Sequence, residues 1–206
     1  MRKIFYFILM LVLFFSIVNA EDIIFSEGTF WQYRVSDEKS NGPDFEVTDS
    51  YDYTVKVVKV GTLSDFKNIS VNFPKTVVKI SQVNIYDEDG NIFDSGFFTL
   101  DSDDSIWMFN TYGYGWMVYK SGLPIGYTWK AEMQEGVIST FICKGYEDVK
   151  TQAGSFENVM KIVSKFEGDE EGKITYWVAK GIGMVKSVSS DGYETQITEL
   201  VKYGSK

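Results

Sequence analysis

An aromatic stretch in the middle of the chain contains the side chains best suited to binding a ligand. Tyr112, Tyr114 and Trp116 alternate with glycines, and more rings lie nearby in the sequence. The nearby rings are Phe97, Phe98, Trp107, Phe109, Tyr119, Tyr127 and Trp129. Sugar- and peptide-binding grooves use such rings, because a ring stacks on an apolar face while polar neighbours orient the ligand. Aromatic residues also favour strands and cores, an alternative that applies most to Trp107, Phe109 and Trp116. Tyr112, Tyr114 and Trp116 are therefore the predicted ligand-binding residues, with the two tyrosines placed in a turn.

Carboxylates gather in two segments that also contain turn residues. They are Asp87, Glu88, Asp89 and Asp94 in the first, and Asp101, Asp103 and Asp104 in the second. Calcium takes about six to eight oxygen ligands, which such loops can supply. No helical pattern flanks these loops and no Glu stands at the twelfth EF-hand position, so solvated hairpin tips are favoured and no metal is predicted. Two carboxylates also suffice for glycoside hydrolysis, so a glycan-active enzyme using Asp101 and Asp104 stays an alternative.

Composition excludes several catalytic chemistries. The chain has no histidine and a single cysteine, Cys143. Ser-His-Asp and Cys-His catalysis are therefore excluded, as is any disulfide within the chain. Cys143 lies in an apolar run, which predicts a buried and unreactive thiol. We expect a non-enzymatic protein without a cofactor.

Residues 1–20 have the composition of a secretory signal peptide. Arg2 and Lys3 precede an apolar run at residues 4–18, and small residues precede the predicted cleavage site between Ala20 and Glu21. The run is shorter than the roughly 20 apolar residues that a transmembrane helix needs, although retention of the leader as an anchor stays open. No cysteine lies near the predicted cleavage site, where a lipoprotein needs one as its first mature residue, so no lipid anchor is expected. Residues 21–206 are predicted to form an exported domain, periplasmic or extracellular, without a transmembrane span.

The charge of the mature domain limits its partners. Without Arg2 and Lys3 the chain keeps 18 basic residues against 29 acidic ones, a net charge of −11. Nucleic acids and anionic membranes both attract basic surfaces, so neither is a predicted partner. The length fits one ordinary domain with its own core.

Apolar residues recur with a period of two along nearly the whole mature chain, which is the spacing of strands. Residues 51–57 alternate most regularly, and in residues 77–86 the apolar phase shifts between Ile80 and Val83, which predicts a β-bulge. Turn signals such as Asp89-Gly90 separate the runs. Strands are predicted near residues 30–35, 51–60, 68–73, 76–86, 92–100, 105–112, 116–119, 127–133, 136–146, 159–166, 174–179, 184–188 and 193–202.

These strands predict an all-β fold in a single domain. A strongly curved antiparallel meander sheet is expected, in the form of an incomplete barrel or a sandwich. Residues 36–50 are polar and contain Asn41-Gly42-Pro43, so they are predicted to form a loop or flap.

A motif near the C-terminus reads Tyr176-Trp177-Val178-Ala179-Lys180-Gly181-Ile182-Gly183-Met184-Val185-Lys186. Its glycines favour a tight strand connection over phosphate binding, because no helix follows to present its N-terminus to an anion. Trp177 is expected in the core.

Three further segments accompany this motif: Gly28-Thr29-Phe30-Trp31-Gln32-Tyr33, residues 149–162 and Glu199-Leu200. Together they resemble a family of uncharacterised exported bacterial proteins, many of them lipoproteins. The resemblance implies an exported antiparallel β-domain and supplies no established activity. This chain departs from the family because it lacks the lipobox cysteine.

The functional expectation is a binding or envelope-associated role. A curved sheet can enclose an apolar pocket, so a hydrophobic small molecule is expected, with an envelope component or a protein as the other possible partners. A carbohydrate-binding module that uses the aromatic turn is the alternative.

Overall fold

The computed structural model describes residues 25–41, 44–67, 69, 71–168, 172–180, 182–190 and 194–205. The described chain is almost entirely β, with one short 3-10 helix, η1, at Leu63–Phe66. The strands are β1 (Phe30–Asn41), β2 (Asp44–Gly61), β3 (Val77–Tyr86), β4 (Ile92–Asp101), β5 (Ile106–Asn110), β6 (Gly115–Tyr119), β7 (Thr128–Gln134), β8 (Val137–Thr151), β9 (Gly154–Phe166), β10 (Lys173–Ala179), β11 (Gly183–Ser190) and β12 (Glu194–Gly204).

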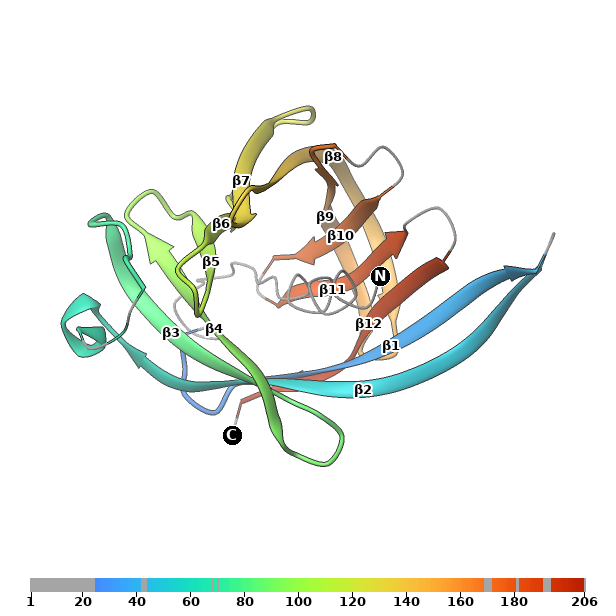
Figure 1. Cartoon of the computed structure of the whole chain (residues 1–206), viewed down its shortest axis with the longest axis horizontal. Helices are drawn as coiled ribbons and strands as arrows, with labels where there is room; N and C mark the ends of the chain where they lie inside the picture. The colour runs from blue at the N-terminus through green and yellow to red at the C-terminus, as the bar shows by residue number, and fades with distance from the viewer. Residues whose placement is uncertain are drawn as a thin grey trace.

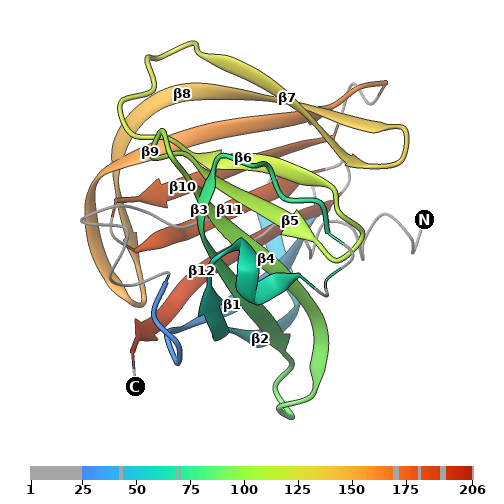
Figure 2. The ribbon, with the colours of Figure 1, turned by 90° about the vertical axis from the view of Figure 1, so that its left-hand side faces the viewer.

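The twelve strands form one antiparallel sheet in the order β6-β5-β4-β3-β2-β1-β12-β11-β10-β9-β8-β7. The sheet consists of two meanders, β1 to β6 and β7 to β12, joined because β1 pairs with β12. It curls until the two end strands, β6 and β7, lie side by side (Figures 1 and 2). The prediction of a single all-β domain with a strongly curved antiparallel sheet is confirmed. Of the two predicted forms, incomplete barrel and sandwich, the sheet adopts the incomplete barrel.

Side chains bridge the seam between β6 and β7. Trp129 Nε1 on β7 donates to Met117 O on β6 at 3.0 Å. Asn110 Nδ2 at the end of β5 donates to Met133 O on β7 at 3.3 Å. The Trp129 ring also stacks on Phe141 of β8, with centroids 5.4 Å apart. The seam is therefore held by side chains, since β6 and β7 are not hydrogen-bonded neighbours in the strand order.

Large side chains fill the interior of the barrel. The largest that are fully buried in the main apolar cluster are Trp31, Trp116, Tyr33, Tyr176, Phe98 and Phe141. Burying one such side chain contributes on the order of 2 kcal/mol. The interior of the described sheet is therefore a packed core.

Two aromatic side chains of β1 hold the main chain of the β10–β11 connection. Trp31 Nε1 donates to Ile182 O and the Tyr33 hydroxyl donates to Met184 O, both at 3.0 Å. The Tyr33 ring stacks on Tyr53 of β2 with centroids 5.2 Å apart. Each hydrogen bond joins residues 151 positions apart, so the pair connects the start of one meander to the end of the other.

A second apolar cluster lies on the outer face of β3, β4 and β5. Its buried members are Phe66, Val71, Val77, Ile80, Phe97 and Phe109. Ile80 belongs to this outer cluster, whereas Val83 and Ile85 belong to the main core. The pairing of β3 with β4 is regular from Ile80 to Ile85, so the predicted bulge in β3 is wrong. The alternation of apolar residues changes phase because β3 buries its outer face at Ile80 and its inner face at Val83 and Ile85. In the pairing of β2 with β3, the register shift lies in β2, between Val57 and Lys59.

Two segments differ from their predicted structure. The loop predicted for residues 36–50 is wrong, because residues 36–41 and 44–50 extend β1 and β2 as paired strands, in which Ser36 pairs with Ser50. Residues 47–50 are exposed, so an outward-pointing hairpin carries no alternation of apolar residues. The described part of residues 68–73 is not a strand, although Ile69, Val71 and Phe73 alternate, because these side chains pack onto the outer cluster without a ladder.

The predicted signal peptide, residues 1–20, and its cleavage site at Ala20 and Glu21 lie outside the described residues. In the described ranges, no helix is both long enough and apolar enough to cross a bilayer.

Within the C-terminal motif, the interior position belongs to Tyr176. Tyr176 is 0% exposed, whereas Trp177 is half-buried, because neighbouring strand residues face opposite sides of the sheet. On the outer face the Trp177 indole donates to Glu147, and the Lys161 ammonium lies 5.0 Å from the centre of its ring. The expectation that Trp177 lies in the core is therefore wrong.

The two adjacent residues of this motif predict unequal costs of truncation. Tyr176→Ala should lower the free energy of unfolding by about 3 to 5 kcal/mol, because it removes a fully buried ring and leaves a cavity. Trp177→Ala should cost about 1 to 2 kcal/mol, because its ring is half solvated. Urea unfolding of both variants measures the difference. A larger loss for Trp177→Ala would contradict this assignment of faces.

Candidate functional site

The three predicted ligand-binding residues do not share one surface. Tyr112, in the β5–β6 turn, is 81% exposed, Tyr114 is half-buried, and Trp116 on β6 is 1% exposed in the interior. Asn110 Oδ1 accepts the main-chain N–H groups of Tyr112 and Tyr114 at 3.0 Å each, which fixes the turn. The Trp116 indole N–H has no hydrogen-bond partner among the described residues. Ligand binding by these three residues stays a prediction.

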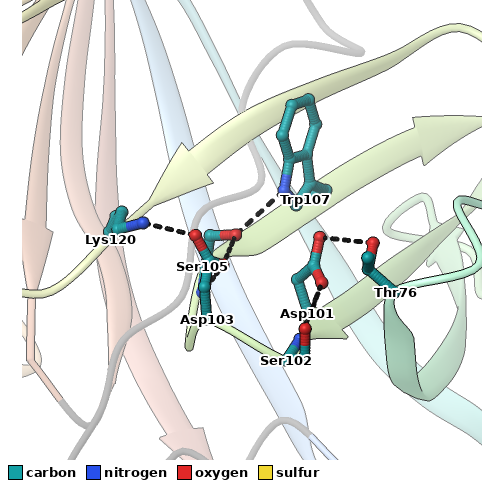
Figure 3. A network of polar contacts seen from close by, with 7 residues as sticks. All are labelled: Thr76, Asp101, Ser102, Asp103, Ser105, Trp107 and Lys120. Carbon is teal, nitrogen blue, oxygen red and sulfur yellow. Dashed lines mark hydrogen bonds and ion pairs between the residues drawn. The ribbon is translucent and has the colours of Figure 1, made fainter.

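The acidic turn between β4 and β5 is a structural network (Figure 3). Asp103 accepts from the Ser105 hydroxyl and forms an ion pair with Lys120, which follows β6. The Ser105 hydroxyl in turn accepts the Trp107 indole N–H at 3.1 Å. The ion pair with Lys120 and then the hydrogen bond from Ser105 lower the pKa of Asp103 to about 2. Asp103 therefore ties the β4–β5 turn to the end of β6.

Asp101 holds the same turn from its other side. Its carboxylate accepts from the Thr76 hydroxyl at 3.0 Å and from the Ser102 N–H at 2.6 Å (Figure 3). Asp104 has a φ of 61° and donates its N–H to Asp101 O at 3.1 Å. Of the two carboxylates that could form a glycan-hydrolysing pair, Asp101 is thus engaged in shaping the hairpin.

The other acidic segment forms the tip of the β3–β4 hairpin. Asp87 accepts the main-chain N–H of Asn91 at 2.7 Å and its side-chain N–H at 3.2 Å, which closes the turn. Asp94 is partly buried on β4, and this burial raises the pKa of its carboxyl. In the part of the chain that the structure describes, no group of three or more carboxylates or thiols is placed to hold a metal ion.

A groove of about 380 Å³ lies between this hairpin and β2. It is lined by Tyr51, Asp52, Tyr53, Asp87, Glu88, Asp89 and Phe93. The last pair between β2 and β3 joins Thr54 to Tyr86, and the pairing of β3 with β4 shifts register between Ile85 and Tyr86. The groove therefore forms where β2 continues beyond the end of β3.

The groove places aromatic rings beside carboxylates. Phe93 is 42% exposed and Tyr51 is half-buried, whereas Tyr53 is only 2% exposed. The Tyr53 hydroxyl is buried and has no hydrogen-bond partner among the described residues, and burial raises its pKa well above the ordinary value. A buried hydroxyl without a partner is costly, and a ligand atom or a water molecule could satisfy it.

Two of the carboxylates in the groove already have partners. Asp52 accepts from Arg34 Nε at 2.8 Å and from Arg34 Nη2 at 3.1 Å, so its charge is neutralised. Glu88 Oε1 accepts the main-chain N–H of Asp52 at 2.6 Å and forms none of the described ion pairs, although Arg34 lies near enough to interact with its charge. The hairpin therefore makes the groove electronegative, and it can contact an apolar group and a positive charge at once.

The parts of this groove are visible in the sequence, but their proximity is not. The alternation of Tyr51, Asp52 and Tyr53 predicted a strand, and Asp87 to Asp89 predicted a hairpin tip. Asp52 and Glu88 are 36 positions apart in the sequence, and folding brings them into hydrogen-bond contact. The alternation of Tyr and Asp in one strand was the only sequence feature that could have indicated a surface with both aromatic and acidic side chains.

The Asp103 network predicts a dependence of stability on pH. The folded protein holds the pKa of Asp103 near 2, below its ordinary value of 3.8, so the charged form is favoured by folding. This stabilisation is complete above about pH 4 and is lost as the pH falls toward 2. Asp103→Asn should be less stable than wild type at pH 7, and the difference should shrink between pH 4 and 2. Urea midpoints measured across this range test it, with Lys120→Gln as the matched variant; parallel curves for wild type and Asp103→Asn would contradict it.

No family model matches this chain, and neither does any curated protein. Its structure is similar to that of a predicted exported protein with a YmcC-like fold from Bacteroides fragilis, at 15% identity and a TM-score of 0.51, over 94% of this chain and 99% of that one. A predicted lipoprotein from Parabacteroides distasonis is 13% identical with a TM-score of 0.45, over 88% of this chain and 97% of that one. The similarity to the B. fragilis protein shows that this chain has the same, YmcC-like fold.

Proposed function

We propose that this protein is exported and acts as a non-enzymatic binding protein in the periplasm or outside the cell. Its ligand carries a positive charge beside an apolar group and binds between β2 and the β3–β4 hairpin. One observation carries the proposal: the groove sets the rings of Tyr51 and Phe93 beside the carboxylates of Asp87, Glu88 and Asp89.

Export is supported by two independent features. Residues 1–20 have the basic start, apolar run and small residues of a signal peptide. The B. fragilis protein that shares the fold is described as exported. An exported protein meets envelope components and extracellular proteins, and either class can supply a cationic ligand.

The packing of the interior argues for a ligand at the surface. A hydrophobic ligand inside the barrel would need space that Trp31, Trp116 and Tyr176 occupy, each of them at most 1% exposed. The groove offers apolar contact through Tyr51 and Phe93 without displacing this core. Two opposite unit charges about 4 Å apart attract by roughly 1 kcal/mol in water and more near a protein surface, so the hairpin carboxylates favour a cation.

A non-enzymatic role is supported by the residues available for chemistry. The chain has no histidine, and Cys143 is fully buried. Asp87, Asp101 and Asp103 hold hairpin turns through hydrogen bonds, as acidic residues in structural turns commonly do.

Short peptides test the groove directly. The amide of Lys-Trp-Lys carries an aromatic ring between cations and is too short to form a strand, and its doubly acetylated form removes the lysine charges. Titration followed by NMR should show weak, salt-sensitive binding of the first peptide at the Tyr51 and Phe93 signals. The acetylated form should bind at least about fivefold more weakly, because the attraction to the carboxylates is lost.

Matched variants locate the binding site. Phe93→Ala and Asp89→Asn should each weaken binding of Lys-Trp-Lys about three- to tenfold through loss of ring contact or charge. Ile92→Ala is the control, because Ile92 is 57% exposed beside Phe93 and does not line the groove. Equal affinity for both peptides, or equal loss in all three variants, would refute the proposed site.

A carbohydrate-binding role is the second candidate, favoured by the 81% exposure of Tyr112 in the β5–β6 turn. A neutral oligosaccharide in the same titration separates the two candidates. Sugar binding that Tyr112→Ala abolishes and Phe93→Ala leaves intact would favour the carbohydrate module over the cationic ligand.

A further inference from the structure

The groove lies along an unpaired edge of β2. β2 runs from Asp44 to Gly61 and pairs with β1 from Asp44 to Lys56, whereas β3 pairs only with Thr54 to Gly61. On the side facing away from β1, no described strand pairs with residues 44–53. At about 3.3 Å per residue, this edge is long enough to accommodate a short extended peptide.

Two main-chain N–H groups along this edge donate hydrogen bonds to carboxylates. The Asp52 N–H donates to Glu88 Oε1 at 2.6 Å, and the Ser50 N–H donates to Asp49 Oδ1 at 2.8 Å. Alternate residues of a strand direct their N–H groups to the same side, so both donors point away from β1. A carboxylate oxygen on each donor stands in for the carbonyl oxygen that a paired strand would supply.

The two faces of this strand differ in chemistry. Asp52 lies on the outer face with Arg34, whereas Tyr53 packs against Tyr33 in the interior and Tyr51 shares its side of the strand. Side chains of an added strand alternate in the same way. A complementary strand would therefore place basic side chains on one face and apolar side chains on the other.

Charge selects the occupant of the edge. Arg34 neutralises Asp52, but Asp49 on the strand and Asp87, Glu88 and Asp89 on the hairpin still give the edge one predominant sign. A second copy of this chain would bring the same carboxylates together, and residues 21–206 carry a net charge of −11. Like charges placed opposite each other destabilise strand pairs, whereas opposite charges stabilise them.

We infer that the β2 edge receives an extended basic peptide from a partner protein, which adds to the sheet as a further strand. This inference rests on the proposed function and names the class of its ligand. The main chain of the peptide replaces the carboxylates on the Ser50 and Asp52 N–H groups. Its lysine or arginine side chains meet the displaced carboxylates, and its apolar side chains contact Tyr51 and Phe93. Strand addition of this kind takes affinity from main-chain hydrogen bonds and specificity from alternate side chains.

The experiment compares labelled peptides of about nine residues that alternate lysine with valine, long enough to cover the free edge. Two further peptides carry N-methyl groups on one or the other set of alternate amides, so that each loses the hydrogen bonds of one edge only. Fluorescence anisotropy with the full chain measures their affinities. The unmodified peptide and one methylated peptide should bind alike, and the other methylated peptide should bind at least about tenfold more weakly.

A protein variant makes the same comparison from the other side of the interface. Ser50→Pro removes an edge N–H and Ser50→Ala retains it, and Ser50 is exposed, so both proteins should fold. Ser50→Pro should weaken binding about five- to tenfold relative to Ser50→Ala, which corresponds to one hydrogen bond. Circular dichroism confirms that the two variants contain the same sheet.

The outcomes separate this inference from the proposed function. Equal binding by all three peptides, or by Ser50→Pro and Ser50→Ala, would overturn strand addition while Lys-Trp-Lys binding still supported the groove. Binding of Lys-Trp-Lys without any binding of the longer peptide would also overturn strand addition alone. Loss of Lys-Trp-Lys binding would refute the proposed function, and this inference with it.

Discussion

The hydrogen bonds from Trp31 and Tyr33 to the β10–β11 connection are the contacts on which the arrangement of the sheet depends. β1 lies at the middle of the strand order and pairs with β12, and its side chains reach past β12 to Ile182 O and Met184 O at the start of β11. Gly183 lies between these acceptors with a φ of 116°, a conformation that is open mainly to glycine. A buried indole or phenol that lost its acceptor would be costly, so the β1 aromatics and the glycine turn require each other. This contact joins residues 28–33 near the N-terminus to residues 176–186 near the C-terminus.

The groove follows from the position of β1 in this arrangement. β1 is paired on both sides, to β2 and to β12, over most of its length, which keeps β2 extended far beyond the last residue of β3. The β3–β4 hairpin then turns beside a strand that has lost its neighbour, and Glu88 accepts the first N–H left unpaired, that of Asp52. The joining of the two meanders and the groove thus both depend on β1, because the strand that joins the meanders also supports the free edge of β2.

Alternation of apolar residues in the sequence predicted strands correctly where a paired strand buries one face. It failed where alternating side chains are buried but their main chain is not paired with another strand. Tyr53 and Val55 are buried on β2 and their neighbours are more exposed, so residues 51–57 were predicted as the strand that they form. Ile69, Val71 and Phe73 alternate as well, but they cover the outer cluster without a ladder, and alternation reports burial only. The groove could not be predicted, because it depends on where β3 stops relative to β2, and no local pattern encodes the mutual register of strands more than thirty positions apart.

Carboxylates in similar turns have different roles because their neighbours differ. Asp103 is neutralised by Lys120 across the β4–β5 turn, and Asp52 is neutralised by Arg34 on the outer face. Such exposed pairs contribute only about 0 to 1 kcal/mol each to stability, so their main consequence here is that Asp52 and Asp103 carry no free negative charge. Among the described residues Glu88 accepts a main-chain N–H and forms no ion pair, so its charge is less fully compensated than that of Asp52. The negative charge on the groove wall therefore comes mainly from the hairpin, which Asp87 fixes through its two hydrogen bonds to Asn91.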